Sequence, residues 1–168
     1  DAQCGNAELA PAPRFRIGSV EPMDVTDELI DVMARANGRI CRHLHLPLQS
    51  GSTDILAQMN RPYTADDFLA LVEKLRANIP SVSLSTDIIV GFPGETENDF
   101  LQTCSVAQAC CFSKIHVFPY SKREGTPAAQ RADQIAPSIK TERAARLRNL
   151  GDKLSHRDFE SRAGSTEW

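Results

Sequence analysis

Apolar and polar residues alternate along three separate segments of the chain, and a fourth segment is apolar throughout its second half. Residues 14–20, 43–48 and 114–119 show the alternation, whereas residues 82–90 end in a continuous run of isoleucine and valine. Alternation is typical of a strand with one buried face, and a continuous run is typical of a strand buried on both faces. The pattern therefore predicts four β-strands.

Helical spacing of apolar residues predicts helices in the intervals between these strands. They are expected after Thr26, around residues 55–59, after Thr64, after Thr96 and over residues 137–162. Threonine is a favoured N-cap, and an aspartate three residues after Thr64 and Thr96 completes a capping box in both cases.

The order of these elements limits the fold. Units of strand, turn and helix that follow one another in series imply parallel strands with right-handed crossovers. Four strands are too few for a closed eight-stranded barrel. The expected fold is therefore α/β, either an open or partial barrel or a piece of a larger one.

The helical spacing of apolar residues predicts which side chains of two helices face the core. After Thr96, apolar residues recur at helical spacing, which places Cys104 and Cys111 in the core and leaves Cys110 free to be exposed. In the long helix, the residues expected to face inward are Ile139, Leu147, Leu150 and Leu154.

Composition narrows the class of protein. The 168 residues are 41% apolar and 24% charged, as in an ordinary globular domain, and the net charge of -3 gives no general attraction to nucleic acid. No apolar run of about 18 residues and no signal peptide are recognised, so no membrane partner is expected. The five cysteines are irregularly spaced and include no Cys-x-x-Cys pair. This favours reduced thiols in a cytoplasmic protein over disulfides or a zinc ribbon.

Polar residues collect at or just after the carboxyl ends of the predicted strands. Glu21 follows the first strand, Gln49 and Ser50 follow the second, Asp87 lies in the third, and residues 116–120 end the fourth. Because the carboxyl ends of parallel strands meet at one rim, these residues are expected to form a site. Asp87 is the one charge in its strand and needs a protein or ligand partner; the alternative is that it only braces a neighbouring turn.

The residue types at this rim suit a nucleoside. Gln49 and Asp87 offer donors and acceptors for the vicinal hydroxyls of a ribose. Arg61 could reach back to a carboxylate, although spacing alone favours a surface arginine at a helix end. His43 and His45 could bind a metal, but a hydrogen-bonding role inside the barrel is favoured, because no carboxylate or cysteine is spaced to join them.

The last helix is rich in basic residues. A strip for the phosphate backbone of a nucleic acid could form from Lys140, Arg143, Arg146, Arg148, Lys153, Arg157 and Arg162, together with Lys122 and Arg123. A solvated helix face is the favoured interpretation, because acidic residues of the same helix can pair with these cations.

Five motifs give the chain a family resemblance. They occupy residues 45–52, 59–64, 86–96, 116–121 and 125–128; the first reads HLPLQSGS, the third TDIIVGFPGET and the fourth HVFPYS. In these motifs, which occur in order between about Arg14 and Gly164, the chain resembles the radical S-adenosylmethionine (SAM) methylthiotransferases. Around residues 43–46 and 116–120 it is most similar to the branch acting on threonylcarbamoyladenosine beside the tRNA anticodon. The branches acting on isopentenyladenosine or on a ribosomal-protein aspartate are the alternatives.

The resemblance implies a partial (β/α)6 radical-SAM barrel with S-adenosylmethionine bound across the strand ends. It implies that Glu21 and Arg61 hold the methionyl amino and carboxylate groups. Gln49 and Asp87 would hold the ribose, and main-chain atoms of two strands would flank the adenine. The cofactor-binding residues expected on this basis are Glu21, Gln49, Ser50, Arg61, Asp87, Val90, Gly91, Val117 and Phe118.

The cysteines depart from the family pattern. In the family, three cysteines spaced Cys-x-x-x-Cys-x-x-Cys hold a 4Fe-4S cluster, and no such triplet is present. The chain is therefore expected to be a fragment, truncated on the N-terminal side and inactive alone. Its expected regions are an irregular segment over residues 1–13, the second half of the barrel over 14–136, and an exit helix over 137–168. The N-terminal and C-terminal domains would be missing, and the full-length enzyme would act on the tRNA anticodon stem-loop.

Two other functions stay open on the sequence alone. A cluster-free protein could bind SAM or RNA without performing chemistry. Alternatively, an unrelated α/β enzyme could use Asp87 and Glu95 as acid and base.

Overall fold

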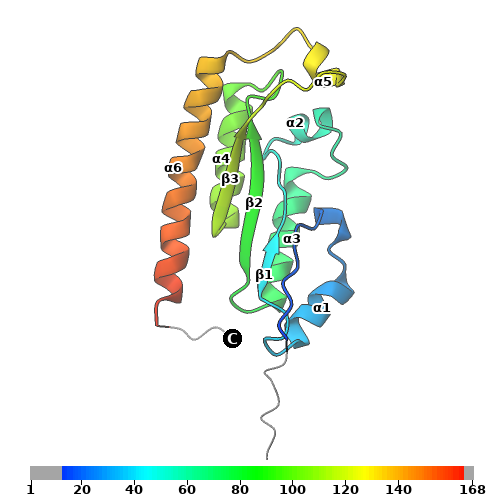
Figure 1. The fold of residues 1–168 in the computed structure, drawn as a ribbon, viewed down its shortest axis with the longest axis vertical. Helices are drawn as coiled ribbons and strands as arrows, with labels where there is room; N and C mark the ends of the chain where they lie inside the picture. The colour runs from blue at the N-terminus through cyan, green and yellow to red at the C-terminus, as the bar shows by residue number, and fades with distance from the viewer. Residues whose placement is uncertain (1–12, 165–168) are drawn as a thin grey trace, which may run out of the picture.

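A parallel sheet forms the centre of the molecule, whose computed structural model describes residues 13–164. Its strands are β1 (His43–His45), β2 (Ser83–Val90) and β3 (Lys114–Pro119), paired in the order β1-β2-β3 (Figure 1). Both pairings are parallel, which confirms the predicted α/β class. The segment predicted to be irregular, residues 1–13, lies outside the described residues except for its last residue.

Helices lie before, between and after the strands. They are η1 (Pro22–Asp24), α1 (Asp27–Arg35), α2 (Thr53–Gln58), α3 (Ala65–Asn78), α4 (Glu97–Cys110), α5 (Pro127–Gln130) and α6 (Pro137–Arg162). The apolar spacing predicts all of them except η1 and α5. Thr26, Thr64 and Thr96 are the N-caps of α1, α3 and α4, and both predicted capping boxes are complete. No helix among residues 13–164 has the length and apolar character needed to cross a membrane.

The segment predicted as the first strand contacts the sheet through two isolated parallel bridges. Phe15 pairs with Ile40, and Ser19 pairs with His45. The Val20 amide donates to the His45 carbonyl at 3.0 Å. Gly18 lies between the two bridges, and a glycine weakens a continuous ladder. The segment therefore runs parallel to β1 without forming a regular fourth strand.

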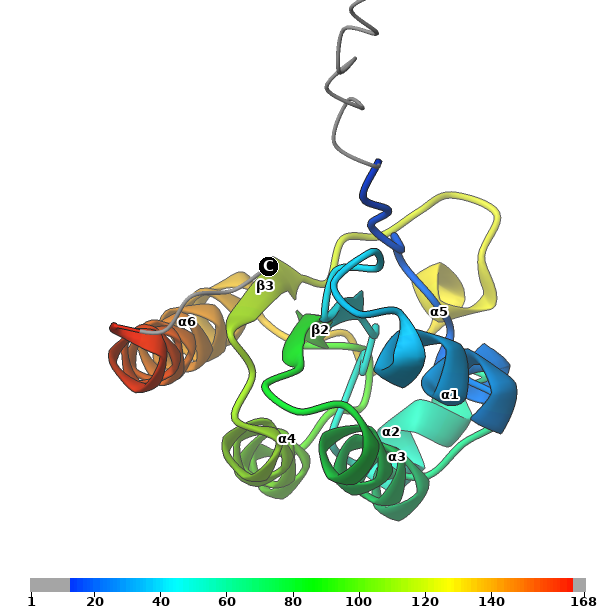
Figure 2. The same ribbon diagram turned by 90° about the horizontal axis from the view of Figure 1, so that it is seen from below.

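The two faces of the sheet have opposite environments. On one face, residues such as Leu44, Leu84, Ile88 and Ile115 are buried in the core, against α3, α4 and α6, which Figure 2 shows gathered on one side of the sheet. The other face carries exposed and half-buried side chains, with Ser85 as the one buried member. They are His43, His45, Ser83, Ser85, Asp87, Ile89, Lys114, His116 and Phe118. This open face is the one available to a ligand.

Close approach of α4 to the turn after β1 depends on Gly51. A Cβ atom at this position would lie 2.6 Å from the Thr103 Cα, a distance that backbone atoms cannot accommodate. The Gly51 amide donates to the Thr103 hydroxyl at 3.0 Å, and the Ser50 hydroxyl lies 3.3 Å from the same oxygen. Ser50 is fully buried here. Its side chain therefore fastens the turn to α4 and does not reach the rim where the sequence suggested it would lie.

A buried ion pair joins α6 to the glycine turn after β2. Arg143 donates from Nη1 to the Glu95 carboxylate at 2.6 Å and to the Glu95 carbonyl at 3.1 Å. The same carboxylate oxygen accepts from the Gly91 amide at 2.7 Å. Burial raises the pKa of Glu95, although the hydrogen bonds from Gly91 and Arg143 oppose this effect. Glu95 is buried, and its Oε2 already accepts from Gly91 and Arg143, so it is not placed to act as the acid or base of the alternative enzyme.

Several basic residues in the first half of α6 form specific contacts with neighbouring elements. Arg143 is 5% exposed and is held by Glu95. Arg146 pairs with Glu97 of α4 at 2.7 Å, and the Lys140 ammonium donates to the Tyr120 carbonyl at 3.0 Å. These contacts favour a structural role for Lys140, Arg143 and Arg146 over a place in a strip for nucleic acid.

Two residues predicted to face the core do not do so. α4 ends at Cys110, which is fully buried, and Cys111 follows as an exposed C-cap with a φ of 43°. The left-handed backbone takes Cys111 out of the helical phase on which the prediction rested. Ile139 is 40% exposed, because α6 makes its buried contacts only from Arg143 onward.

Replacing Arg143 by methionine should destabilise the protein strongly. Glu95 would keep its buried carboxylate but lose its counter-ion, and such a loss costs about 3–5 kcal/mol. Arg146→Met is the matched control, since Arg146 lies one turn further along α6 but is partly exposed, and its loss should cost less than about 1 kcal/mol. Urea denaturation measures both variants. Equal, small losses would contradict the role given to the buried pair.

Candidate functional site

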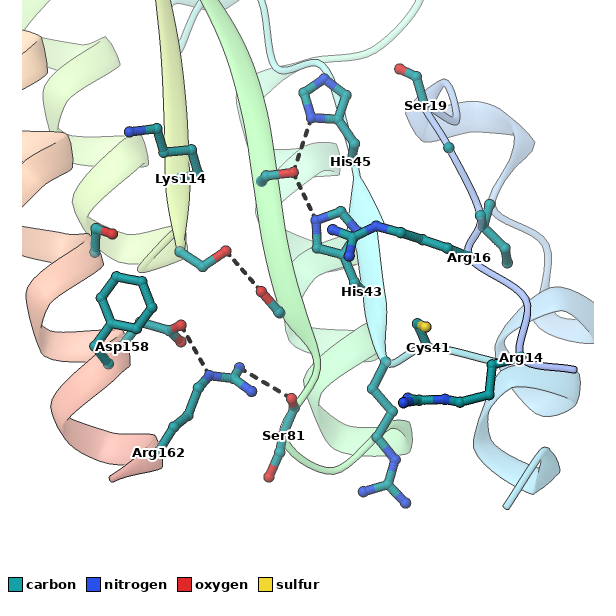
Figure 3. Close-up of a pocket in the computed structure, with 18 of the residues that line it drawn as sticks. Arg14, Arg16, Ser19, Cys41, His43, His45, Ser81, Lys114, Asp158 and Arg162 are labelled. Atoms are coloured by element: carbon teal, nitrogen blue, oxygen red, sulfur yellow. Dashed lines mark hydrogen bonds and ion pairs between the residues drawn. The ribbon is translucent and has the colours of Figure 1, made fainter. Parts of the chain in front are cut away.

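A chain of hydrogen bonds crosses β1 and β2 on the open face. The parallel register places His43 opposite Ser83 and His45 opposite Ser85. The Ser85 hydroxyl lies 3.1 Å from His43 Nε2 and 3.0 Å from His45 Nδ1, and dashed lines in Figure 3 mark these contacts of the two labelled histidines. His45 Nε2 lies 3.3 Å from Asp87 Oδ1. Asp87 therefore has a protein partner, and the two histidines have the hydrogen-bonding role that the sequence favours.

The Asp87 carboxylate determines which atoms donate and which accept along this series of hydrogen bonds. An ionised carboxylate only accepts, so a neutral His45 carries its hydrogen on Nε2, and its Nδ1 accepts from Ser85. Ser85 then accepts from His43 Nε2, which leaves His43 Nδ1 bare. That atom is buried with no partner among the described residues. Burial, followed by the charges of Arg16 and His45, lowers the pKa of His43 below its usual 6.5, which favours the neutral ring.

Asp87 stands between histidines of the two neighbouring strands. His116 of β3 lies directly opposite Asp87 in the register, and His45 of β1 is a diagonal neighbour. One ligand atom from each of these three side chains lies within 4.8 Å of the other two. Sequence spacing gave the histidines no carboxylate partner, because Asp87 is remote from His45 along the chain and only the sheet brings them together.

Beyond the carboxyl end of β1, Glu21 and Arg61 form an ion pair. Arg61 Nη1 lies 3.2 Å from a Glu21 carboxylate oxygen, with the arginine side chain 30% and the glutamate side chain 43% exposed. Arg61 thus contacts a carboxylate of the protein, whereas spacing alone favoured a surface arginine. Arg61 Nε is buried and donates to no described atom. The pair therefore offers a cation with a spare donor beside an accessible anion.

Gln49 lies next to Asp87 at the end of the sheet. Its backbone is left-handed, with a φ of 66°. Its amide donates to the Asp87 carbonyl at 2.9 Å, and its carbonyl accepts from the Ile89 amide at 2.9 Å. The structure therefore brings Gln49 and Asp87 together, as the argument from parallel strand ends predicts.

Val90, Gly91, Val117 and Phe118 are the residues expected beside an adenine, and they differ in which of their groups already have hydrogen-bond partners. The Val90 carbonyl accepts from the Tyr120 amide, and the Gly91 amide donates to Glu95, so both main-chain groups already have partners. The Val117 carbonyl accepts from Arg148 at 3.4 Å. The Phe118 side chain is 50% exposed and lies on the open face, opposite Ile89 in the register.

An open groove of about 1400 Å³ lies against the amino-terminal half of the same face. Its lining is largely polar and includes five cationic residues, Arg14, Arg16, Arg42, Lys114 and Arg162, several of which Figure 3 labels. His45 and His116 also line it, whereas Glu21, Gln49, Arg61 and Asp87 do not. The groove and the rim are therefore two adjoining regions, and the two histidines lie between them.

Sequence reasoning missed Ser85 as a member of this site. A signal was present, because Ser83, Ser85 and Asp87 alternate with buried residues along one strand and so must share a face. Their position next to the histidines could not be read from the sequence, since it depends on the register between strands.

Comparisons with known proteins agree on a family. A family model described as the Radical SAM superfamily matches residues 7–107. A tRNA-2-methylthio-N(6)-dimethylallyladenosine synthase from Caldicellulosiruptor saccharolyticus is 51% identical over 142 residues, which cover 84% of this chain and 30% of the relative. A threonylcarbamoyladenosine tRNA methylthiotransferase from Bacillus subtilis is 46% identical over 142 residues, which cover 84% and 31%.

A solved structure supports the fold independently. Coproporphyrinogen III oxidase from Escherichia coli, described as a radical SAM enzyme, matches 84% of this chain and 32% of its own chain with a TM-score of 0.65. At 21% identity this likeness concerns the fold alone. The chain spans about 30% of the length of the curated relatives it matches.

Replacing Ser85 by alanine should destabilise the protein by about 1–3 kcal/mol. The substitution removes the hydroxyl that joins two partly buried imidazole rings, and unpaired buried polar atoms carry a cost of this size. Ser105→Ala on the exposed side of α4 is the control and should change the stability by less than about 0.5 kcal/mol. Chemical denaturation at pH 7.5 measures both. A Ser85→Ala variant as stable as the control would show that the hydrogen-bond chain contributes nothing.

Proposed function

The chain belongs to the radical SAM superfamily, and we propose that it forms the part of a tRNA methylthiotransferase that holds S-adenosylmethionine. The family match supports the cofactor class. The two methylthiotransferase relatives, each matched over 84% of this chain, support the reaction class.

The observation that carries this proposal is the Glu21–Arg61 pair with its spare donor. An amino acid such as the methionyl end of S-adenosylmethionine has one ammonium and one carboxylate. The ammonium can replace Arg61 as the partner of Glu21, while the carboxylate takes the Arg61 guanidinium, including the buried Nε that has no described partner. Glu21 and Arg61 would therefore exchange each other for the charged groups of the ligand. No charged side chain of the protein would have to be buried for the first time when the ligand binds.

The residues beside this pair suit the rest of the cofactor. We place the ribose hydroxyls at Asp87 and Gln49, which lie together at the end of the sheet and supply acceptors and donors. The adenine then reaches the open face at Ile89 and Phe118, where a half-exposed aromatic ring offers a flat apolar surface. The main chain of Val90 and Gly91 would support this surface, since its polar groups are already bonded.

A 4Fe-4S cluster does not fit the cysteines of this chain. The sequence has no Cys-x-x-x-Cys-x-x-Cys triplet. Among the described residues, the one cluster of possible metal ligands contains no cysteine. In a radical SAM enzyme, bound S-adenosylmethionine would supply the reactive radical, and the residues of this chain would bind and orient the cofactor.

The proposed substrate of the whole enzyme is an adenosine beside the tRNA anticodon. We propose the threonylcarbamoyladenosine branch, supported by the residues around His45 and His116 and by the 46% identity to the Bacillus subtilis relative. A second candidate is dimethylallyladenosine, favoured by the 51% identity to the Caldicellulosiruptor saccharolyticus relative.

Replacing Arg61 by methionine or Glu21 by glutamine should weaken binding of S-adenosylmethionine about 10-fold or more. Each change removes one charged hydrogen bond, worth about 1.5–3 kcal/mol. Isothermal titration calorimetry of the 168-residue chain measures the affinity. Arg35→Met and Glu28→Gln, both on exposed positions of α1, are matched controls that should bind like the unaltered chain. Equal weakening by all four variants would contradict the assigned roles.

A chimera tests the reaction class and the branch. The matched 142 residues of each of the two relatives are replaced by the matching segment of this chain, in cells that lack endogenous methylthiotransferases. Mass spectrometry of tRNA nucleosides should show methylthio-threonylcarbamoyladenosine in both backgrounds, and an Asp87→Asn chimera should lose it. Product in the dimethylallyl series alone would favour the second candidate. Stable, folded chimeras that form neither product would overturn the proposal.

A further inference from the structure

We propose that His45, Asp87 and His116 form a binding site for a divalent first-row transition metal ion such as Zn²⁺. The proposal does not depend on the function proposed above. It rests on three side chains of the open face that come from three different strands.

The sheet register aims these three side chains at one point. Asp87 is on the central strand, His116 faces it from β3, and His45 approaches diagonally from β1. Their ligand atoms lie within 4.8 Å of one another, and the two imidazole centroids are 5.9 Å apart at an interplanar angle of 55°. An ion above Asp87 would be reached by both rings through small side-chain rotations.

The donor set determines the class of metal. Two imidazoles and one carboxylate suit Zn²⁺, Fe²⁺ or Co²⁺, whereas Mg²⁺ and Ca²⁺ prefer oxygen ligands. Three protein ligands leave one or more coordination positions open, as in metal sites that bind a further ligand. His116 is exposed and lines the groove with His45, so the ion has a path from solvent.

Ser85 is the supporting residue of this site. It holds His45 Nδ1 at 3.0 Å and thereby fixes the ring whose Nε2 would coordinate the ion. Coordination requires a lone pair on Nε2, so the hydrogen of His45 moves to Nδ1 and donates to Ser85. Ser85 then donates to His43 Nε2. The same hydrogen-bond chain can therefore run in either direction, toward Asp87 without metal and away from it with metal.

The charges around the site make Asp87 the decisive ligand. Lys114 lies opposite Ser85 on the same face, and Arg16 is close enough to His43 to affect its pKa. These two cationic side chains oppose binding of a metal ion, and Asp87 supplies the one negative charge among the three ligands. Metal and ribose would both require the Asp87 carboxylate, so a chain that holds the ion should not hold the nucleoside in the same way.

Titration of the metal-free 168-residue chain with Zn²⁺, in the absence of S-adenosylmethionine, tests the site. One ion should bind per chain. His116→Ala, a substitution at an exposed position, should weaken binding at least 10-fold, and Asp87→Asn should weaken it more. Ser85→Ala should weaken it about 10-fold to 100-fold. His156→Ala on α6, remote from the sheet face, is the control and should bind like the unaltered chain.

Co²⁺ substitution distinguishes this site from the cysteines. The absorption spectrum should show bands of nitrogen and oxygen ligation without thiolate-to-cobalt charge transfer. Thiolate bands, the absence of saturable binding, or unchanged affinity in His116→Ala would each overturn the proposal. Failure of S-adenosylmethionine binding, measured separately at Arg61, would leave the metal result unaffected.

Discussion

The in-register parallel pairing of three strands is the constraint on which the rest of the molecule depends. Side chains alternate between faces with a period of two, so a shift of one residue in either pairing would move Asp87, His45 or His116 into the core. The apolar residues between them fix the register, because they must remain against α3, α4 and α6. The core therefore positions the polar site, although the two share no side chain.

The glycine turn after β2 connects the central strand to α6. Gly91 has a φ of 72°, and its amide is held by the carboxylate that also holds Arg143. One buried anion, Glu95, thus contacts the end of the central strand and the first half of α6, directly before α4 begins. From its composition, α6 was interpreted as a solvated charged helix. Its Arg143 is nevertheless the most deeply buried arginine among residues 13–164.

Local signals in the sequence predicted most of the fold. The Thr–Asp pairs marked two helix starts, the proline at residue 137 marked a third, and β3 has the predicted bounds. Predictions failed where geometry departs from regular periodicity, as at the left-handed Cys111, or where a segment is held by few bridges, as at residues 14–20. The pairing of Glu21 with Arg61 was not predicted, because spacing alone favoured a surface position for Arg61. The His45–Asp87–His116 cluster was not predicted either, because it depends on the register of strands far apart in the chain.

The long crossovers also determine how the chain can fold. The first paired residues of β1 and β2 are His43 and Ser83, and those of β2 and β3 are Ser85 and Lys114. The chain between the paired residues is therefore shorter for β2 and β3. Closing the shorter loop loses less chain entropy, and α4 within it begins at a complete capping box. The βαβ unit β2–α4–β3 is therefore the favourable nucleus, onto which β1 and α6 dock afterwards. Because both pairings are non-local, folding should be slow relative to that of a helical bundle of this size.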